Sequence, residues 1–286
     1  MRLCRFDDNK LGVVLGDEVA DVTEALDLLP AVRWPVPLGD LLIQHLDEIV
    51  AKAGGLEGSA PRKALSDVKL LSPVANPSKI IGAPVNYQLH IDEANADKAS
   101  FGQTQEIKSI DYYGPFLKAN TSLVGADEGV AIRFPDRRND HEVELAVVIG
   151  KTGTNISYDD AMDHVAGYSI GLDMTVRGTE DRSVRKSVDT YSVLGPWFVT
   201  KDEIADPDKL DFWITVNNEI RQKSNTSYLI YDIRKQIEYF SSFYTLVAGD
   251  VIMTGTPEGV GPVKGGDTMV AEMEGIGRME VAVRDA

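Results

Sequence analysis

The sequence predicts an α+β fold that is mainly β. Short apolar, β-branched runs recur along the chain and are bounded by Gly, Pro, Asn or Asp, which is typical of strands and turns. Two longer segments, 38–53 and 228–246, instead carry apolar side chains at helical spacing. A linker is predicted over 70–77, where two prolines favour extended chain, so we expect a small β-rich N-terminal domain over 1–72 and a larger domain over 73–286.

Composition narrows the classes of function. The 286 residues are 43% hydrophobic and 26% charged, as in ordinary globular proteins, and the net charge is −16. This acidity argues against a nucleic-acid partner and against an anionic membrane surface. A single cysteine, Cys4, excludes internal disulfides and cysteine-based zinc sites. No long apolar run or signal-peptide pattern is present, so we expect a cytoplasmic protein without a membrane partner.

The N-terminal domain is expected to be a small β-meander with one helix. Strands are predicted over 3–6, 11–15 and 19–22, joined by turns at 7–9 and 16–17, and the helix is predicted over 38–53. His45 in that helix is interpreted as a packing or surface residue, because no acidic or hydroxyl motif accompanies it. This part of the chain therefore carries no evident chemistry.

A histidine and a glutamate follow the first strand of the larger domain, predicted over 79–82. His90 and Glu93 are three residues apart, so a helix here would place them on one face. A carboxylate beside an imidazole can orient it and raise its basicity, which gives a dyad able to deprotonate water. The alternative is a loop histidine near an exposed glutamate. The polar segment 94–111 fits a loop that acts as a lid.

An acidic strand is predicted over residues 140–150. Side chains alternate faces along a strand, so Glu142 and Glu144 point to one side while Val143 and Leu145 point to the other. Two carboxylates on one sheet face repel each other, and a hard divalent cation would offset that repulsion. A solvated polar face is the alternative for an isolated Glu-x-Glu pattern.

A second apolar strand, predicted over 165–173, supplies a third acid. Glycine and serine share a face with Asp173 and allow another element to approach closely. Asp173 would then join Glu142 and Glu144. Three carboxylates with waters form a usual set of ligands for a hard divalent ion.

A cluster of basic residues, Arg177, Arg182, Arg185 and Lys186, follows in this acidic chain. One interpretation is a solvated loop that balances nearby acids. The other is a cationic pocket for carboxylate and enolate oxygens.

The remaining elements complete the predicted β-rich domain. Strands are expected over 194–200 and 210–217, the helix over 228–246, and a strand–turn–strand unit over 269–283. The Gly/Thr/Pro loop within 246–261 does not follow the spacing of a nucleotide-binding loop.

In combination, these motifs resemble the fumarylacetoacetate hydrolase family, across residues 73–286. The matching pieces, in the family's order, are Asn86-Tyr87 with His90-x-x-Glu93, Glu142-x-Glu144-Leu145, Asp173 with Arg177, Lys186-x-x-x-Thr190, Leu194-Gly195-Pro196, Gly249-Asp250-Val251-Ile252 and Thr254-Gly255-Thr256-Pro257-x-Gly259-Val260-Gly261.

The resemblance implies a mixed β-sandwich roll, a homodimer and a metal-dependent enzyme. Mg²⁺ or Mn²⁺, with Ca²⁺ as a further option, would be held by Glu142, Glu144 and Asp173. Substrates would be small 2-oxo carboxylic acids of acylpyruvate type. The implied reaction is hydrolysis of a C–C bond in a 2,4-dioxo acid through a metal-bound enolate.

The resemblance also implies roles for individual side chains. His90 and Glu93 would activate the water, and Lys186 would bind or polarise the substrate oxygens. Arg177 and Thr256 would hold the carboxylate. The full set of implied substrate contacts is Arg177, Thr190, Thr256 and Tyr87.

Alternatives to the hydrolase remain. Within the same family, the chain could be an isomerase, a tautomerase or a decarboxylase of 2-oxo or 2-hydroxy-diene dioic acids, and outside enzymes it could be a metal-binding homologue. The His90–Glu93 dyad favours hydrolysis. One departure concerns Glu180, where the family often has Gln, since an acid there would oppose a bound carboxylate.

Overall fold

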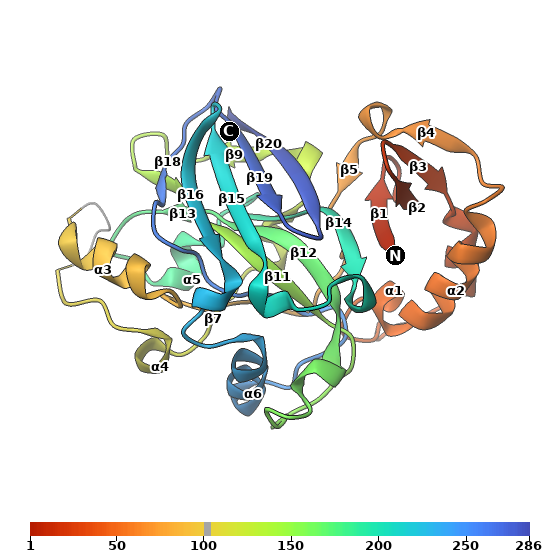
Figure 1. The fold of residues 1–286 in the computed structure, drawn as a ribbon, viewed down its shortest axis with the longest axis horizontal. Helices are drawn as coiled ribbons and strands as arrows, with labels where there is room; N and C mark the ends of the chain where they lie inside the picture. Colours follow the sequence, from red (N-terminus) through yellow and green to blue (C-terminus); the bar gives the residue numbers. More distant parts are fainter. Residues whose placement is uncertain (100–103) are drawn as a thin grey trace.

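The computed structural model describes residues 1–99 and 104–286. Its largest sheet is twelve-stranded and runs from the N-terminal part of the chain into the centre of the molecule (Figure 1). The strands are β1 (Arg2–Phe6), β2 (Lys10–Leu15), β3 (Glu18–Asp21), β4 (Arg62–Ala64), β5 (Leu70–Leu71), β6 (Ile80–Gly82), β7 (Phe116–Lys118), β8 (Leu123–Val124), β11 (Val143–Ile149), β12 (Val165–Asp173), β14 (Ser192–Thr200) and β17 (Val251–Met253). Their order is β4-β3-β2-β1-β14-β12-β11-β17-β6-β7, with β5 beside β1 and β8 beside β14.

Two smaller sheets complete the β structure. One comprises β9 (Val130–Ile132), β15 (Asp211–Val216), β16 (Glu219–Asn225), β19 (Thr268–Met273) and β20 (Gly277–Asp285), in the order β16-β15-β19-β20-β9. The other comprises β10 (Asn139–His141), β13 (Thr175–Val176) and β18 (Gly261–Pro262), in the order β13-β10-β18. The predicted α+β class, mainly β, is confirmed.

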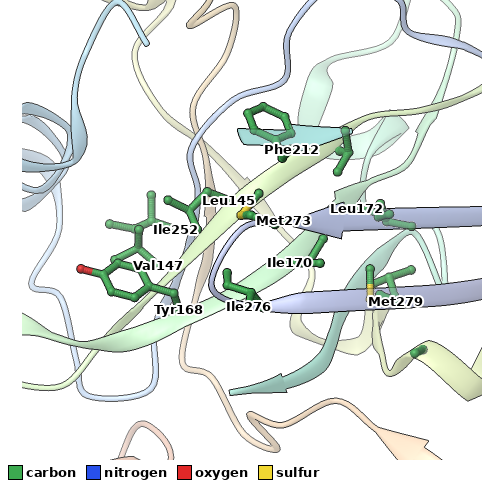
Figure 2. Packing of buried hydrophobic residues seen from close by; sticks show 14 of the residues in the cluster. Leu145, Val147, Tyr168, Ile170, Leu172, Phe212, Ile252, Met273, Ile276 and Met279 are labelled. Carbon is green, nitrogen blue, oxygen red and sulfur yellow. The ribbon is translucent and has the colours of Figure 1, made fainter. Parts of the chain in front are cut away.

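The main hydrophobic core lies between the large sheet and the five-stranded sheet. Leu145 on β11 and Ile170 on β12 belong to it, together with Phe212 on β15 and Met279 on β20 (Figure 2). All four side chains are at most 1% exposed. Burial of large apolar side chains on this scale contributes about 1.5–3 kcal/mol for each of them, so this core fixes the position of β11 and β12.

Strand β11 is buried on both faces, which explains its nearly continuous apolar sequence. Leu145 and Val147 face the core just described, whereas Ala146 and Val148 belong to a second cluster shared with the N-terminal strands. The predicted strand over 140–150 is interrupted at Glu142, so that β10 and β11 lie in different sheets.

The N-terminal strands continue the large sheet. Arg2 and Leu3 of β1 pair with Val199 and Phe198 of β14 in antiparallel register. The predicted helix over 38–53 is observed as α1 (Leu41–Gln44) and α2 (Leu46–Leu56). Leu70–Leu71, expected to begin a linker, forms β5 and pairs with β1. The division into domains 1–72 and 73–286 stays a prediction.

The helices lie around the sheets (Figure 1). Those of the larger region are α3 (Gln88–Ala96), α4 (Ile110–Tyr113), α5 (Arg182–Arg185) and α6 (Ile233–Phe243), and 3₁₀ helices cover Thr23–Leu28, Leu65–Asp67, Asn120–Ser122, Ala126–Glu128, Ala161–His164, Lys201–Glu203, Pro207–Lys209 and Thr226–Tyr228. Helix α6 is shorter than predicted because Asp232 caps its N-terminus by accepting from Lys235 N at 2.7 Å. The segment expected to form a lid, 94–111, includes residues outside the described ranges. Across 1–99 and 104–286, no helix is long and apolar enough to span a membrane.

Candidate functional site

Three acidic side chains meet where β11 and β12 pair. The strands are antiparallel, with Glu144 opposite Gly171, and Asp173 N donates to the carbonyl of Glu142 at 2.9 Å. Because side chains alternate faces, Glu142, Glu144 and Asp173 lie on the same face. One carboxylate oxygen from each lies within 4.8 Å of the others, and all three residues are buried. The structure therefore brings together the acids that the sequence groups.

Lys186 lies against this acidic cluster. Its ammonium donates to Glu142 Oε2 at 2.5 Å, to Asp173 Oδ2 at 2.6 Å and to Thr175 Oγ1 at 2.7 Å. Lys186 is the C-terminal cap of α5, where its backbone N–H donates to the carbonyl of Arg182 at 2.9 Å. The short helix thus positions the predicted lysine at the acids.

A second lysine, Lys118 at the end of β7, reaches the cluster from the other side. Its ammonium pairs with Asp173 Oδ1 and donates to the carbonyl of Tyr191 at 2.7 Å. The Lys118 side chain is fully buried, and burial lowers its pKa. Lys118 was not among the predicted site residues. The only signal was a lysine two residues after Phe116, which places both on one strand face.

The two glutamates differ in their electrostatic surroundings. Burial works to raise the pKa of Glu142, but the positive charges of Lys186 and Arg177 outweigh it and lower the pKa to about 2. For Glu144, burial and the negative charge of Asp173 raise the pKa well above its usual range. Gly255 N donates to Glu144 Oε2 at 2.8 Å. The surroundings of Glu142 therefore favour its charged form more strongly than those of Glu144 do.

The donor set fits a hard divalent cation. Three carboxylates supply oxygen ligands, which suit Mg²⁺ and Mn²⁺, and they converge within 4.8 Å of one another. A dication would also lower the cost of keeping Glu144 ionised next to Asp173. Glu142, Glu144 and Asp173 are thus the residues that would hold the metal.

Arg177 and Asp140 hold the carboxylate of Glu142 in the acidic cluster in place. Arg177 Nε donates to Asp140 Oδ2 at 2.7 Å, and its Nη2 donates to Glu142 Oε1 at 3.0 Å. Arg138 Nε donates to the other oxygen of Asp140, also at 2.7 Å. Burial opposes the charge of Arg177, but Glu142 and Asp140 outweigh it and raise its pKa. Asp140 was not among the predicted site residues, and it fixes the guanidinium beside the acids.

Thr256 is held in place by Gln222 of β16. Gln222 Nε2 donates to Thr256 Oγ1 at 2.7 Å, and Thr256 Oγ1 donates to the carbonyl of Val143 at 3.0 Å. Gln222 Oε1 accepts from Val143 N at 3.1 Å and lies 3.0 Å from His141 Nδ1. Since an amide oxygen only accepts, His141 Nδ1 is the donor. No strand was predicted over residues 219–225, so Gln222 was not among the predicted site residues.

The predicted dyad forms on α3. His90 Nδ1 lies 3.4 Å from Glu93 Oε2, and both residues belong to this helix, as their spacing predicts. Both carboxylate oxygens of Glu93 accept from Gly259 N, at 3.1 Å each. Gly259 has a φ of 87°, which favours glycine. The loop after β17 therefore fixes the carboxylate that faces the histidine.

A cavity opens in front of the acidic cluster. Among the predicted site residues, those that line it are His90, Glu142, Glu144, Asp173, Arg177, Lys186 and Thr256. Arg182 and Arg185 of α5 line it as well, and Phe116 and Ile107 supply apolar wall. The cavity therefore combines acids, cations and one histidine.

Three predicted residues lie outside this lining. Glu93 contacts His90 and does not itself line the cavity. Tyr87 is buried, with its ring edge-on to Phe212 at 6.4 Å between centroids, and burial raises its pKa well above the usual range. Thr190 Oγ1 accepts from Ala131 N at 2.8 Å. The structure does not bring Tyr87 or Thr190 to the cavity.

Glu180 also lies outside the cavity lining. Its two oxygens accept from Arg137 Nη1 at 3.0 Å and Nη2 at 2.8 Å, and these hydrogen bonds lower its pKa. This bidentate pair is partly exposed to solvent. The acid is therefore engaged by an arginine and does not face a ligand in the cavity.

Comparison with known proteins identifies the family of this chain. The fumarylacetoacetate (FAA) hydrolase C-terminal family matches residues 79–284. A maleylpyruvate hydrolase of Aquipseudomonas alcaligenes is 57% identical over 285 residues, which is 99% of each chain. A mitochondrial oxaloacetate tautomerase of Xenopus laevis is 34% identical over 298 residues, 97% of this chain and 88% of the relative.

Among solved structures, maleylpyruvate hydrolase from Sphingobium sp. SYK-6 in complex with manganese(II) and pyruvate is 37% identical. It has a TM-score of 0.83, with 100% of each chain covered. The resemblance inferred from the sequence motifs is thereby confirmed, and so is the fold expected from it. This chain belongs to the fumarylacetoacetate hydrolase family.

Proposed function

We propose that this protein is a metal-dependent hydrolase that cleaves a C–C bond in a 2,4-dioxo acid, with maleylpyruvate as its substrate. The observation that carries the proposal is the buried cluster of Glu142, Glu144 and Asp173 in a cavity that His90 also lines. The high identity to a maleylpyruvate hydrolase supports the substrate. In this reaction, water and maleylpyruvate give maleate and pyruvate.

The metal site is assigned to the three acids. Mn²⁺ or Mg²⁺ bound there would supply Lewis acidity for the 2-oxo group and positive charge for the enolate that C–C cleavage generates. The relative from Sphingobium binds manganese(II) and pyruvate, which agrees with this assignment.

The cationic side chains orient the pyruvate part of the substrate. The ammonium of Lys186 lies at the acids and donates to Glu142 and Asp173. A metal held by these acids would take over their charge and leave the ammonium donors for the carboxylate and 2-oxo oxygens of the substrate. Arg177 lines the same cavity and supplies further donors for the carboxylate, whereas the hydroxyl proton of Thr256, which also lines it, is engaged by the carbonyl of Val143. Held donors of this kind also stabilise negative charge as it develops on the enolate oxygen.

His90 is assigned as the general base. It removes a proton from water, and the hydroxide adds to the C4 carbonyl carbon of the substrate. The C3–C4 bond then breaks, its electron pair passes into the enolate of pyruvate, and C4 leaves as the new carboxyl group. The proton on His90 returns to C3. Glu93, 3.4 Å from His90 Nδ1, orients the imidazole and stabilises its charged form.

Tautomerisation of a 2-oxo dicarboxylic acid is the second candidate. The Xenopus relative is named an oxaloacetate tautomerase, and both reactions pass through an enolate. They differ in the delivery of water to a second carbonyl. The presence of His90 beside Glu93 on the cavity wall favours hydrolysis.

A substrate panel tests the proposal. The metal-stripped protein receives Mn²⁺ or Mg²⁺, then maleylpyruvate or oxaloacetate, and products are followed by NMR. We expect maleate and pyruvate to form only with metal. Glu142→Gln and Asp173→Asn should reduce the rate by at least about 10³-fold, whereas Glu219→Gln, an exposed surface acid, should not. Wild-type rates without metal, or in the two site variants, would overturn the proposal.

A homodimer and a cytoplasmic location are also part of the proposal. Trp34, Val36 and Leu38 are 92%, 62% and 72% exposed, and exposed apolar groups of this kind favour association. Light scattering should give twice the monomer mass, and Trp34→Glu should lower it. Cell fractionation tests the location.

A further inference from the structure

One guanidinium in the active-site cavity lacks a full set of partners. Arg185 of α5 lines the cavity and is 5% exposed. Its Nε donates to the carbonyl of Glu180 at 2.8 Å. Its Nη1 is buried and has no hydrogen-bond partner among the described residues. A buried donor left unpaired costs about 1–3 kcal/mol, so the position calls for an acceptor.

The charges around Arg185 also call for an anion. Within 1–99 and 104–286, neither Arg185 nor Arg182 forms a salt bridge, whereas Lys186 next in sequence pairs with two acids. Burial and the positive charges of Arg177 and Arg182 lower the pKa of Arg185, and the negative charges of Glu142 and Glu180 offset this only in part. A buried guanidinium without an ion-pair partner is stabilised when a carboxylate binds it, usually in a bidentate manner.

The geometry of α5 separates two functions along one short helix. Arg182 and Arg185 are three residues apart, so they share a helix face, and both line the cavity. The guanidinium of Arg182 stacks on the ring of Tyr113, with 4.0 Å from its carbon to the centroid. Lys186, at the end of the helix, lies at the acidic cluster. The cationic side chains of Lys186, Arg185 and Arg182 therefore follow one another along α5, starting from the acidic cluster.

We propose that Arg185, assisted by Arg182, binds the distal carboxylate of the substrate and makes the enzyme selective for dicarboxylic 2,4-dioxo acids. The inference rests on the proposed function, because it assumes that the pyruvate end of the substrate lies at Lys186 and the acidic cluster. A substrate that carries a second carboxylate satisfies Nη1 of Arg185 and neutralises the cations of α5. An acylpyruvate with an alkyl end leaves them unpaired.

Two substrates that differ at the distal end test this role. Maleylpyruvate carries the second carboxylate, and acetylpyruvate carries a methyl group instead. With Arg185→Gln, we expect kcat/KM for maleylpyruvate to fall about 30- to 300-fold, mainly through KM, since a charge-assisted hydrogen bond is lost. For acetylpyruvate, kcat/KM should change less than about threefold. Arg185→Lys should recover part of the loss for maleylpyruvate.

Product inhibition provides a second readout. Maleate and pyruvate should each inhibit the wild-type enzyme. In Arg185→Gln, the inhibition constant for maleate should rise at least about tenfold while that for pyruvate stays the same. Val184→Ala, an exposed position on the same helix, is the matched control and should leave both constants unchanged.

The outcomes separate this inference from the proposed function. Two results would overturn the role of Arg185 while hydrolysis stands. In the first, Arg185→Gln lowers kcat/KM equally for both substrates and leaves the ratio of the two inhibition constants unchanged. In the second, it changes kcat/KM for neither substrate. If the wild-type enzyme with Mn²⁺ hydrolyses neither substrate, the proposed function fails. Maleate binding by calorimetry then still decides whether Arg185 binds the carboxylate. Should Arg185→Gln fail to fold, Arg185→Lys and Arg182→Gln carry the same comparison.

Discussion

Lys118 and Lys186 bind opposite oxygens of one carboxylate, that of Asp173. Lys118 pairs with Oδ1, and the ammonium of Lys186 lies 2.6 Å from Oδ2. Both lysines are buried, and they come from β7 and from the end of α5. In the metal-free protein, the two ammonium groups therefore offset the charge that the acids bring to the cavity.

Removing Lys118 should weaken the metal-free fold and strengthen metal binding. Lys118→Met keeps the side-chain length but leaves part of the Asp173 charge unpaired, which should lower the free energy of unfolding by about 3 kcal/mol. The more negative cluster should bind Mn²⁺ about tenfold more tightly. Chemical denaturation and calorimetry measure the two effects. Lys79→Met, at a partly exposed lysine that pairs with Asp250, is the control and should leave Mn²⁺ affinity unchanged. Weaker Mn²⁺ binding in Lys118→Met would contradict this account.

Metal binding should release a proton. The pKa of Glu144 is raised by burial and by Asp173, so this acid holds its proton to higher pH than an ordinary glutamate. Because a metal binds the carboxylate, about one proton leaves, and the affinity for Mn²⁺ rises with pH until the pH passes that pKa. In the metal-free protein, the stability from protonated Glu144 is full below the ordinary value of 4.5 and is lost as pH rises through the raised pKa.

Calorimetry in buffers with different heats of ionisation counts the released protons. Glu144→Gln carries no proton at this position and should remove the release together with most of the affinity. A Mn²⁺ affinity that is independent of pH would contradict the assignment of Glu144.

His90 and Glu93 should affect turnover to different degrees. His90→Gln removes the general base and should lower kcat by about 10²- to 10⁴-fold. Glu93→Gln keeps the shape of the side chain but removes the charge that orients His90, so the loss in kcat should be smaller, about tenfold. Gln88→Ala on the same helix is the control. Steady-state kinetics over a pH series measures these effects, and an unchanged kcat in His90→Gln would exclude the role.

Gln222→Leu should destabilise the fold and loosen the site. The substitution removes the acceptor for Val143 N and the donor to Thr256, both buried. Leaving these groups unsatisfied should cost about 2–3 kcal/mol of unfolding free energy. With Thr256 less firmly held, KM should rise more than kcat falls. Lys223→Ala, an exposed neighbour on β16, is the control. Equal denaturation midpoints for the two variants would refute the importance of this network.

Cys4 should be inert in the folded protein. Burial raises the pKa of its thiol to about 12, so the thiolate is scarce at pH 8. Ellman's reagent should react at least about 10²-fold more slowly with the native protein than with the protein in guanidinium chloride. In guanidinium chloride, the single cysteine should react fully. As pH rises from 9 toward 12, the unfolded chain ionises first and stability falls. Rapid native reaction would contradict the burial.

Local patterns in the sequence predicted the strands and the helix that carry most of the site. Strand β12 covers Val165–Asp173, the range that its apolar run predicts. Helix α3 includes both His90 and Glu93, which places them on one helix face as their spacing predicts. Period-2 alternation placed Glu142 and Glu144 on one face, because the geometry of a strand is fixed by the backbone. The order of the motifs predicted the family.

By itself, the sequence predicted the Glu142–Glu144 pair and the His90–Glu93 dyad, since each depends on residue type and short spacing, whereas the roles of Asp173 and Lys186 followed from the resemblance to the family. Only the tertiary structure decided which distant groups meet them. Lys118 and Gln222 reach the site from strands far away in the sequence, which no local pattern specifies, whereas Thr190 is turned to Ala131 N. Register and packing between sheets depend on the whole core, because contacts far apart in sequence fix them together.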